Sequence, residues 1–391
     1  MGQAGVRWSM IQPGMSGQMS SLSPRLNLSF NPFAGLTFRA GYGISEKVPS
    51  LLMLYPDVSW LDLMNVNATR GDKYLGVYTT RIFEHSPKDL RPMRSEKVEL
   101  GIDFSLWKGS SFSIIAFRDD VSGGFSSRND EWIPVIFDRW AASSVTEEGG
   151  VLVYDKAHPT VVDTTIFCNS RMSNTDVHVS RGVEFDFNLG KIRRTGTSLY
   201  LSGAWAETEY WSANEVYQEP KGSSDAYRKI LFIYPAGSRK NLNRSMTASL
   251  RVVQSIPAIA FVVSGTLQAT LYDYSKNRID IQTPVAWQDA EGRHPVTAAQ
   301  LADPSAVLLH GYSLADNIYP KGAYSDRAES WPSLWTVNLR VTKEVSRSFN
   351  LSFYVNNLLF SQPWQSSSIS STKVEKNSNY FSFGFEISLN L

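Results

Sequence analysis

The five histidines are the residues whose chemistry is easiest to test from sequence, because imidazole binds metal ions and transfers protons near neutral pH. They are His85, His158, His178, His294 and His310. A zinc site that can be recognised in a sequence has its ligands at short, regular spacings. These histidines show no such spacing, so the sequence predicts solvated loop histidines and no metal site.

Other catalytic signatures are also missing from the sequence. A β-barrel lipase needs a Ser, a His and an orienting polar residue on adjacent strands. Only one histidine, His178, lies near a predicted strand, so the sequence does not favour a lipase. The chain has no glycine-rich phosphate-binding motif. The loop acids Asp57, Asp62, Asp119 and Asp120 do not follow a calcium-loop pattern. We therefore predict that the protein is not an enzyme and holds no cofactor.

The charges of the 391-residue chain are balanced, with 38 basic and 37 acidic residues and a net charge of +1. This balance argues against nucleic acid as a partner, since nonspecific nucleic-acid binding depends on excess positive charge. The single cysteine, Cys168, cannot form an internal disulfide. The aromatic content is high, with 11 Trp, 17 Tyr and 20 Phe, and these rings need an apolar or interfacial place.

Apolar and polar residues alternate along much of the chain, as expected for strands with two different faces. The clearest example runs from Phe381 to Leu389, where every second residue is Phe, Ile or Leu. The uncharged stretch 252–272 is long enough for a membrane helix, but its period of two and Pro257 predict a hairpin instead. Most of the strands have roughly the nine to thirteen residues that a tilted membrane strand needs. The sequence predicts twelve strands, at 2–10, 22–31, 35–44, 95–107, 110–119, 178–190, 196–210, 244–256, 258–272, 333–344, 347–359 and 379–390.

Short and long connections between these strands alternate strictly after the first loop. The long ones cover 45–94, 120–177, 211–243 and 273–332, with a shorter one at 360–378. Outer-membrane barrels have this rule, because their turns are short on the periplasmic side and their loops are long outside. The sequence therefore predicts an all-β fold, an antiparallel transmembrane β-barrel with its long loops outside the cell. A large soluble β protein stays as an alternative, since its strands also alternate.

Nine charged residues within the predicted strands fall on the polar face of their strands. In a membrane barrel that face lines the lumen, while the opposite, apolar face contacts lipid. Phe385 and Ile102 are thus expected to touch lipid, and their neighbours Glu386 and Asp103 to face the lumen. The predicted lumen-facing residues are Arg39, Lys97, Glu99, Asp103, Glu184, Asp186, Arg251, Arg340 and Glu386.

The aromatic residues fall into two groups. One group lies at strand ends, where amphipathic rings suit the membrane interface; it contains Trp8, Tyr42, Trp107, Trp205, Tyr210, Tyr272, Trp331 and Trp335. The second group lies in the long loops, where rings either stack on a sugar or peptide ligand or pack to keep the loops ordered. The candidate ligand-binding residues are Trp60, Trp132, Trp140, Trp211, Trp287, Tyr312 and Tyr319.

Several segments resemble one family when they are read in order. They are Ser23-Pro24-Arg25-Leu26-Asn27-Leu28-Ser29-Phe30, Leu36-Thr37-Phe38-Arg39-Ala40-Gly41-Tyr42-Gly43, Val48-Pro49-Ser50-Leu51, Leu90-Arg91-Pro92, Ser95-Glu96, Glu99-Leu100-Gly101 and Tyr354-Val355-Asn356-Asn357-Leu358-Leu359, before a last strand ending at Leu391. This series resembles the barrel of TonB-dependent outer-membrane receptors, most of all the large receptors of Bacteroidetes-type bacteria. It covers essentially the whole chain.

The resemblance implies an outer-membrane protein of a Gram-negative bacterium that imports a nutrient with energy relayed by TonB. The nutrient would be a glycan, a peptide or an iron chelate, and a surface lipoprotein is a further partner. Family barrels have about 22 strands and an N-terminal plug that contacts TonB. Neither a plug domain nor a signal peptide is visible here, so residues 1–391 are expected to be the C-terminal portion of such a barrel.

Two alternatives remain at this point. One is a plug-less passive porin or an adhesin-like barrel in the outer membrane, and the other is a secreted soluble β protein. In either membrane case, strands cut from a larger ring have the curvature of that ring. We therefore expect this chain to form either an open, curved sheet or a forced pairing of 2–10 with 379–390.

Overall fold

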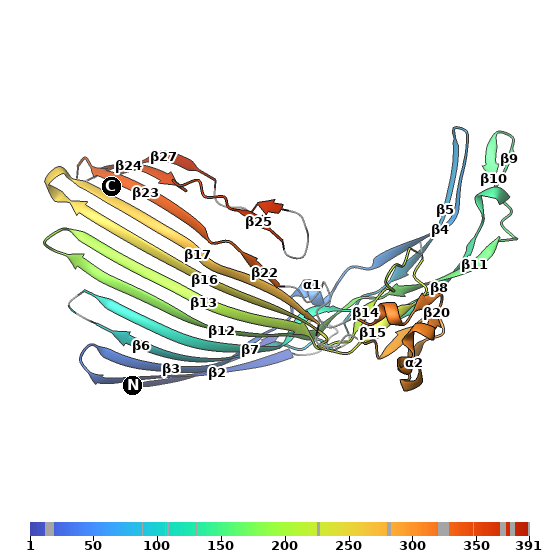
Figure 1. Cartoon of the computed structure of the whole chain (residues 1–391), viewed down its shortest axis with the longest axis horizontal. Helices are drawn as coiled ribbons and strands as arrows, with labels where there is room; N and C mark the ends of the chain where they lie inside the picture. The colour runs from blue at the N-terminus through green and yellow to red at the C-terminus, as the bar shows by residue number, and fades with distance from the viewer. Residues whose placement is uncertain are drawn as a thin grey trace.

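The computed structural model describes residues 1–11, 19–87, 89–105, 107, 109–129, 131–224, 227–279, 283–319, 328–346, 348–367, 373–375 and 380–389. Its main element is one long antiparallel sheet of thirteen strands (Figure 1). Twelve of them follow one another in sequence order, and β22 (Ala328–Trp331) is an additional strand beside β17. The twelve are β1 (Gly2–Ile11), β2 (Met19–Phe33), β3 (Leu36–Lys47), β6 (Met93–Phe104), β7 (Ser111–Arg128), β12 (Arg171–Ile192), β13 (Thr197–Ser212), β16 (Arg239–Ile256), β17 (Phe261–Ile279), β23 (Leu334–Glu344), β24 (Phe349–Asn356) and β27 (Ser382–Leu389).

All twelve predicted strands are present, so the all-β prediction is confirmed. The stretch 252–272 forms the end of β16, a short 3₁₀ turn at Pro257–Ile259 and the start of β17, as predicted. Among the described residues, no helix combines the length and the apolar character needed to cross a membrane. Of the residues in the predicted strands, 106, 347, 379 and 390 lie outside the described part of the chain.

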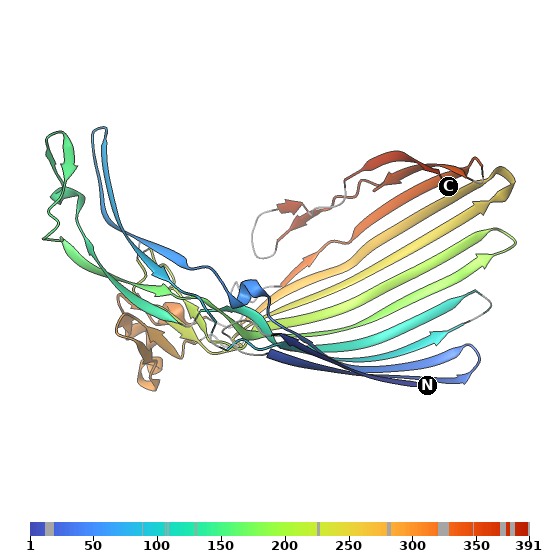
Figure 2. The ribbon, with the colours of Figure 1, turned by 180° about the vertical axis from the view of Figure 1, so that it is seen from behind.

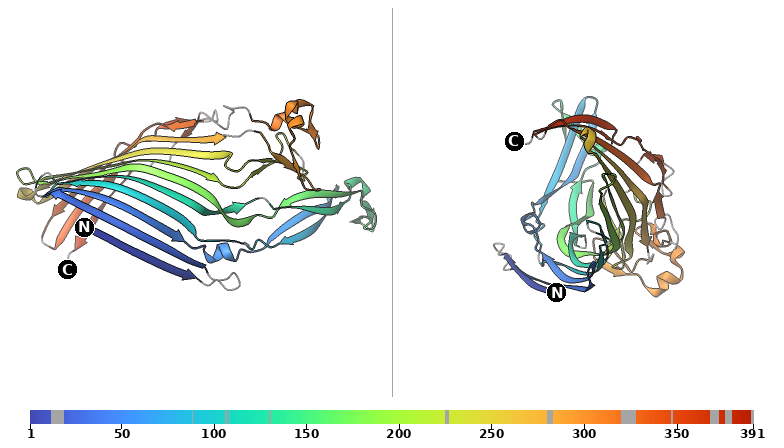
Figure 3. Two further views of the ribbon diagram at one scale, coloured as in Figure 1. Left: turned by 90° about the horizontal axis from the view of Figure 1, so that it is seen from below. Right: turned by 90° about the vertical axis from the view of Figure 1, so that its left-hand side faces the viewer.

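The sheet is open in this structure. Its edge strands are β1 and β27, and no pairing joins them in the described part of the chain. The end-on view in Figure 3 shows a strongly curved sheet that encloses part of a ring. The expected open, curved sheet is therefore confirmed, and the alternative pairing of 2–10 with 379–390 is absent among the described residues.

The cross-strand register gives the sheet two chemically different faces. One row of directly opposed residues crosses eight strands and is polar throughout: Thr37, Asp103, Ser113, Asp186, Ser202, Ser249, Gln268 and Thr336. The adjacent row points to the other face and has no polar side chain apart from an indole: Phe38, Ile102, Ile114, Phe185, Gly203, Ala248, Ala269 and Trp335. Since side chains alternate along a strand, each strand contributes to both faces.

The apolar face ends before the strands do. Four strands, β7, β12, β16 and β17, extend beyond their predicted ends by several residues toward the long loops. There the apolar face carries an ion-paired group in which Glu207 binds Arg181 and Arg244, each at 2.6 Å. The predicted apolar face is therefore continuous only along the part of the strands nearer the short turns, where the alternation is regular.

All the long connections leave the sheet at one end, as the loop alternation predicted, and they form a second layer of structure (Figures 1 and 2). The layer has its own cores because its strands from different loops pack together. One core joins Val66 and Ala68 to Val145 and Leu152, and another surrounds Phe232. The elements are α1 (Leu51–Leu54), β4 (Ser59–Arg70), β5 (Lys73–Phe83), β8 (Trp132–Arg139), β9 (Thr146–Glu148), β10 (Val151–Val153), β11 (Val161–Cys168), β14 (Val216–Gln218), β15 (Leu231–Tyr234), β18 (Ala286–Gln288), β19 (Arg293–Pro295), α2 (Ala298–Ala302), β20 (Leu308–Leu309), β21 (Tyr312–Ser313), β25 (Trp364–Ser366) and β26 (Lys373–Glu375).

Gly196 in the short turn between β12 and β13 is expected to tolerate no side chain. Its φ is +75°, and a Cβ there would lie 2.4 Å from the carbonyl oxygen of Ser255 on β16. Gly109 is a matched control, since it has φ +89° in a short turn but, among the described residues, nothing within 4 Å of its Cβ position. We expect Gly196→Ala to lower the free energy of unfolding by about 1–3 kcal/mol more than Gly109→Ala. Urea unfolding in lipid vesicles measures both, and equal losses would contradict the steric argument.

Candidate functional site

The polar face of the sheet holds the charged residues that the sequence singled out. Backbone register places all nine on this one face, because each lies either in the row of Asp103 and Asp186 or in a row an even number of positions away from it. Several form ion pairs along the face. Arg39 binds Asp103 at 2.5 Å, and Arg340 binds Glu386 at 3.1 Å. These pairs keep the face hydrophilic while leaving little net charge locally.

The middle of this polar face is hollowed. A hollow of about 480 Å³ lies over β12, β13, β16, β17 and β23. Its polar lining comes from Glu184, Asp186, Ser202, Thr247, Ser249, Gln268, Thr270 and Thr336. The lining therefore offers mostly hydroxyl and carboxylate groups, which can hold water or a hydrophilic solute and which lack the geometry of a catalytic triad.

Asp163 on β11 ties two loops of the second layer together. It accepts a hydrogen bond from Arg139 on β8 at 2.7 Å and another from Lys229, which belongs to the next long loop. Lys229 also donates to the carbonyl of Thr164 at 2.6 Å. Burial alone raises the pKa of Asp163, but the hydrogen bonds from Lys229 and Arg139 outweigh it, so the pKa lies below its usual value.

We expect Asp163→Asn to weaken this loop contact by about 1–2 kcal/mol, because a neutral amide cannot balance two cations. Hydrogen exchange of the β11 amides should then become faster, after correction for intrinsic rates. A carboxyl whose folded pKa is depressed stabilises the fold fully above its unfolded pKa, about 3.9, and loses that effect as pH falls through the folded value. The difference between wild type and variant should thus be constant from pH 5 to 8 and shrink as the pH falls below about 3.9.

Asp155→Asn is the matched control for that experiment. Asp155 pairs with His158 at 2.7 Å on an exposed turn, and its carboxylate contacts no second loop in the part of the chain that the structure describes. Its replacement should leave β11 exchange unchanged. A pH-independent effect of Asp163→Asn would contradict the ionic contact.

The candidate ligand-binding aromatics all lie in or beside the loop layer, but they do not converge on one place. Most are in contact with other loop residues. Trp132 lies 5.9 Å from Tyr217 and below the guanidinium of Arg228, and Trp140 lies 5.0 Å from Tyr154. Tyr312 and Tyr319 pack against the core around Phe232. Such packing between aromatic rings keeps long loops ordered. Ligand contact by these rings stays a prediction.

Two of these aromatics differ from the rest. Trp60 on β4 is 64% exposed and points out from the layer. Trp211 was expected in a long loop but belongs to β13, which ends at Ser212, two residues beyond the predicted end at 210. The Nζ of Lys240 lies 5.0 Å from the centroid of the Trp211 ring. Of the predicted interface aromatics, the register places Trp8, Tyr42, Trp205, Tyr272 and Trp335 on the apolar face and Tyr210 on the polar face.

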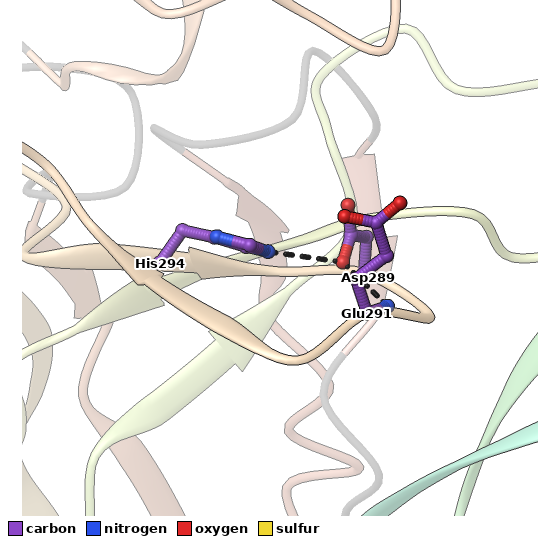
Figure 4. A group of neighbouring side chains, drawn as sticks. All are labelled: Asp289, Glu291 and His294. Atoms are coloured by element: carbon purple, nitrogen blue, oxygen red, sulfur yellow. Dashed lines mark hydrogen bonds and ion pairs between the residues drawn. The ribbon is translucent and has the colours of Figure 1, made fainter.

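A cluster around Asp289 is the feature that sequence reasoning missed. Figure 4 shows Asp289, Glu291 and His294 gathered at the turn between β18 and β19. His310, sixteen positions further along the chain, also reaches Asp289. Burial alone raises the pKa of Asp289, but hydrogen bonds from His310 and His294 outweigh it, so the pKa lies below its usual value. Sequence spacing carried no signal for the pairing because two separate turns bring the imidazoles together.

Comparison with known proteins gives a family and a fold. The sequence model of the TonB dependent receptor-like β-barrel matches residues 2–358. Among curated proteins nothing matches significantly. The siderophore receptor PirA from Acinetobacter baumannii is similar in structure, with a TM-score of 0.52 and 16% identity, over 99% of this chain and 43% of PirA. A variant of the ferric enterobactin receptor PfeA from Pseudomonas aeruginosa, solved with enterobactin, has a TM-score of 0.50 and 14% identity, over 100% of this chain and 43% of PfeA.

The chain thus spans less than half the length of these receptors, and at such identities the likeness concerns the fold. The family model is matched by most of the sequence, from the first strand of the sheet into the segment that follows β24. On that match, this chain belongs to the TonB-dependent receptor-like β-barrel family.

Proposed function

We propose that residues 1–391 form the C-terminal portion of an outer-membrane receptor that imports a nutrient with energy from TonB. The observation that carries the proposal is the pair of unlike faces on one long sheet, with an ordered loop layer at one end only. A lipid-facing apolar surface and a hydrophilic inner surface are what a transport barrel needs. Family membership supports the same function for the whole protein.

In this proposal the polar face lines the lumen. The nine charged residues, including Glu184 and Arg251, then face water or the plug of the complete protein. The apolar face, with Ile102 and Phe385, contacts lipid. Such an arrangement explains why many charges are tolerated within membrane strands. The long loops face the outside of the cell, where the aromatic residues meet the ligand.

The ligand class is a glycan, a peptide or an iron chelate. The aromatic and polar character of the loops favours the first two, through ring stacking on neutral ligands. The two similar structures are a siderophore receptor and a ferric enterobactin receptor, which supports the third. A likeness to Bacteroidetes-type receptors and a surface lipoprotein partner belong to the same proposal.

Uptake by the native host tests the function. A deletion strain is compared with its parent for growth on ferric siderophores, oligosaccharides or peptides as the only source of iron or carbon, with and without a functional TonB. We expect loss of growth on one class, and the same loss in the parent when TonB is removed. Uptake that persists without TonB, together with ion conductance of the purified protein in planar bilayers, would establish a passive porin instead.

A further inference from the structure

The cluster around Asp289 has the ligand atoms of a metal site. Asp289 and Glu291 each offer a carboxylate oxygen and His294 an imidazole nitrogen, and these atoms all lie within 4.8 Å of one another. The side chain of Asp289 is only 6% exposed, whereas His294 remains accessible at 34%. The group is thus anchored inside the layer and open on one side.

Every polar contact of Asp289 helps to fix its carboxylate. Oδ1 accepts hydrogen bonds from the backbone N–H of Glu291 at 2.8 Å and of Gly292 at 3.2 Å. The Nε2 of His294 lies 3.1 Å from Oδ1, and the Nε2 of His310 lies 2.8 Å from Oδ2. Because the carboxylate is held by the turn itself, it stays in place when an imidazole exchanges its hydrogen bond for a metal.

The indole of Trp287 holds the imidazole of His294. The two rings stack with centroids 4.1 Å apart and planes inclined by 21°. Trp287 also meets His310 edge-on at 5.9 Å. A ligand imidazole oriented by its neighbours loses little freedom on binding, which favours a site that is formed before the metal arrives.

We propose that Asp289, Glu291 and His294 bind one divalent transition-metal ion of the Zn²⁺ type, with His310 as the residue that orients Asp289. Zinc bonds of about 2.0–2.2 Å place tetrahedral ligand atoms about 3.4 Å apart, close to the 3.1 Å between His294 Nε2 and Asp289 Oδ1. The ion takes the place of the proton that the imidazole and the carboxylate share. One imidazole with two carboxylates suits zinc and its neighbours better than calcium or magnesium, which bind oxygen alone.

Zinc binding to the protein purified from outer membranes in detergent tests the proposal. After removal of metals with a chelator, Zn²⁺ is titrated in competition with a zinc-sensitive dye. We expect one tight equivalent per chain. His294→Gln retains a hydrogen-bond donor for Asp289 but is a poor ligand, so it should weaken binding by more than a hundredfold. His310→Gln should weaken it by about 10–100-fold, as loss of an orienting group does.

His158→Gln is the matched control, since His158 also pairs with an aspartate, Asp155, but has no third ligand in that pair. It should leave zinc binding unchanged. Circular dichroism shows whether each variant keeps its strand content, and Asp289→Asn, which keeps the size of the side chain, provides a second test. Absence of a tight equivalent in the wild type, or equal binding by folded His294→Gln or Asp289→Asn, would overturn the assignment. The measurement counts bound metal only, so its result is independent of TonB-linked uptake.

Discussion

Replacement of Leu100 by arginine is expected to lower the free energy of unfolding in a lipid bilayer by about 2–4 kcal/mol. Leu100 lies on the apolar face of β6 and is 61% exposed. Its cross-strand neighbours are the small residues Ala40 and Ala116, so nothing beside it can shield a guanidinium from lipid. Arginine there would place a charge near the middle of the hydrocarbon layer. Equilibrium urea unfolding in phospholipid vesicles measures the loss.

Glu99→Gln is the control for that change. Glu99 directly precedes Leu100, so its side chain lies on the opposite, polar face, where it pairs with Lys97 at 2.5 Å. Both partners are half-exposed, and such pairs contribute less than about 1 kcal/mol. We therefore expect a small effect. A large loss with Glu99→Gln and a small one with Leu100→Arg would reverse the assignment of the lipid-facing and lumen-facing sides.

The second large effect concerns the open edges. We expect residues 1–391, placed alone in a membrane, not to form a closed barrel. The described structure leaves β1 and β27 without partners on their outer sides, and each unpaired backbone N–H or C=O in lipid costs several kcal/mol. Because strand number, tilt and stagger are linked, twelve strands shaped for a larger ring do not close at low cost.

Disulfide cross-linking and gel mobility test this expectation. In a Cys168→Ser background, cysteines at Val6 and Phe385 should not cross-link in the chain alone. Cysteines at the directly opposed Ala248 and Ala269 of β16 and β17 should cross-link readily. The chain should also lack the heat-dependent mobility of closed barrels. Efficient cross-linking of 6 to 385 in a heat-modifiable monomer would show that the chain closes by itself.

The strands could be predicted because their signal is local. Alternation along β27, where Phe383, Phe385 and Ile387 follow one another at every second position, requires no knowledge of any neighbour. Gly196 and the other short turns end strands through their own backbone preferences. The strand ends near the long loops were less well predicted. There the alternation gives way to charged residues such as Arg181 and Glu207, whose pairing with each other only the register shows.

The packing of the loop layer could not be predicted from the sequence, because its contacts join residues from different loops. Asp163 and Lys229 are far apart in the chain, and their contact depends on two hairpins that lie side by side. The same holds for the aromatic residues. Their abundance in loops was evident, but whether Trp132 faces a ligand or Tyr217 depends on packing between loops.

The sequence by itself determined the fold class, the twelve strands, the two faces and the family, since each follows from short-range alternation and from motifs read in order. Only the tertiary structure decided that the sheet is open, that the loops share cores, and that His294 and His310 meet at Asp289. The physical reason is that the alternation that marks a strand is set residue by residue along its own length, whereas a cluster of side chains from distant turns forms only after the chain has folded.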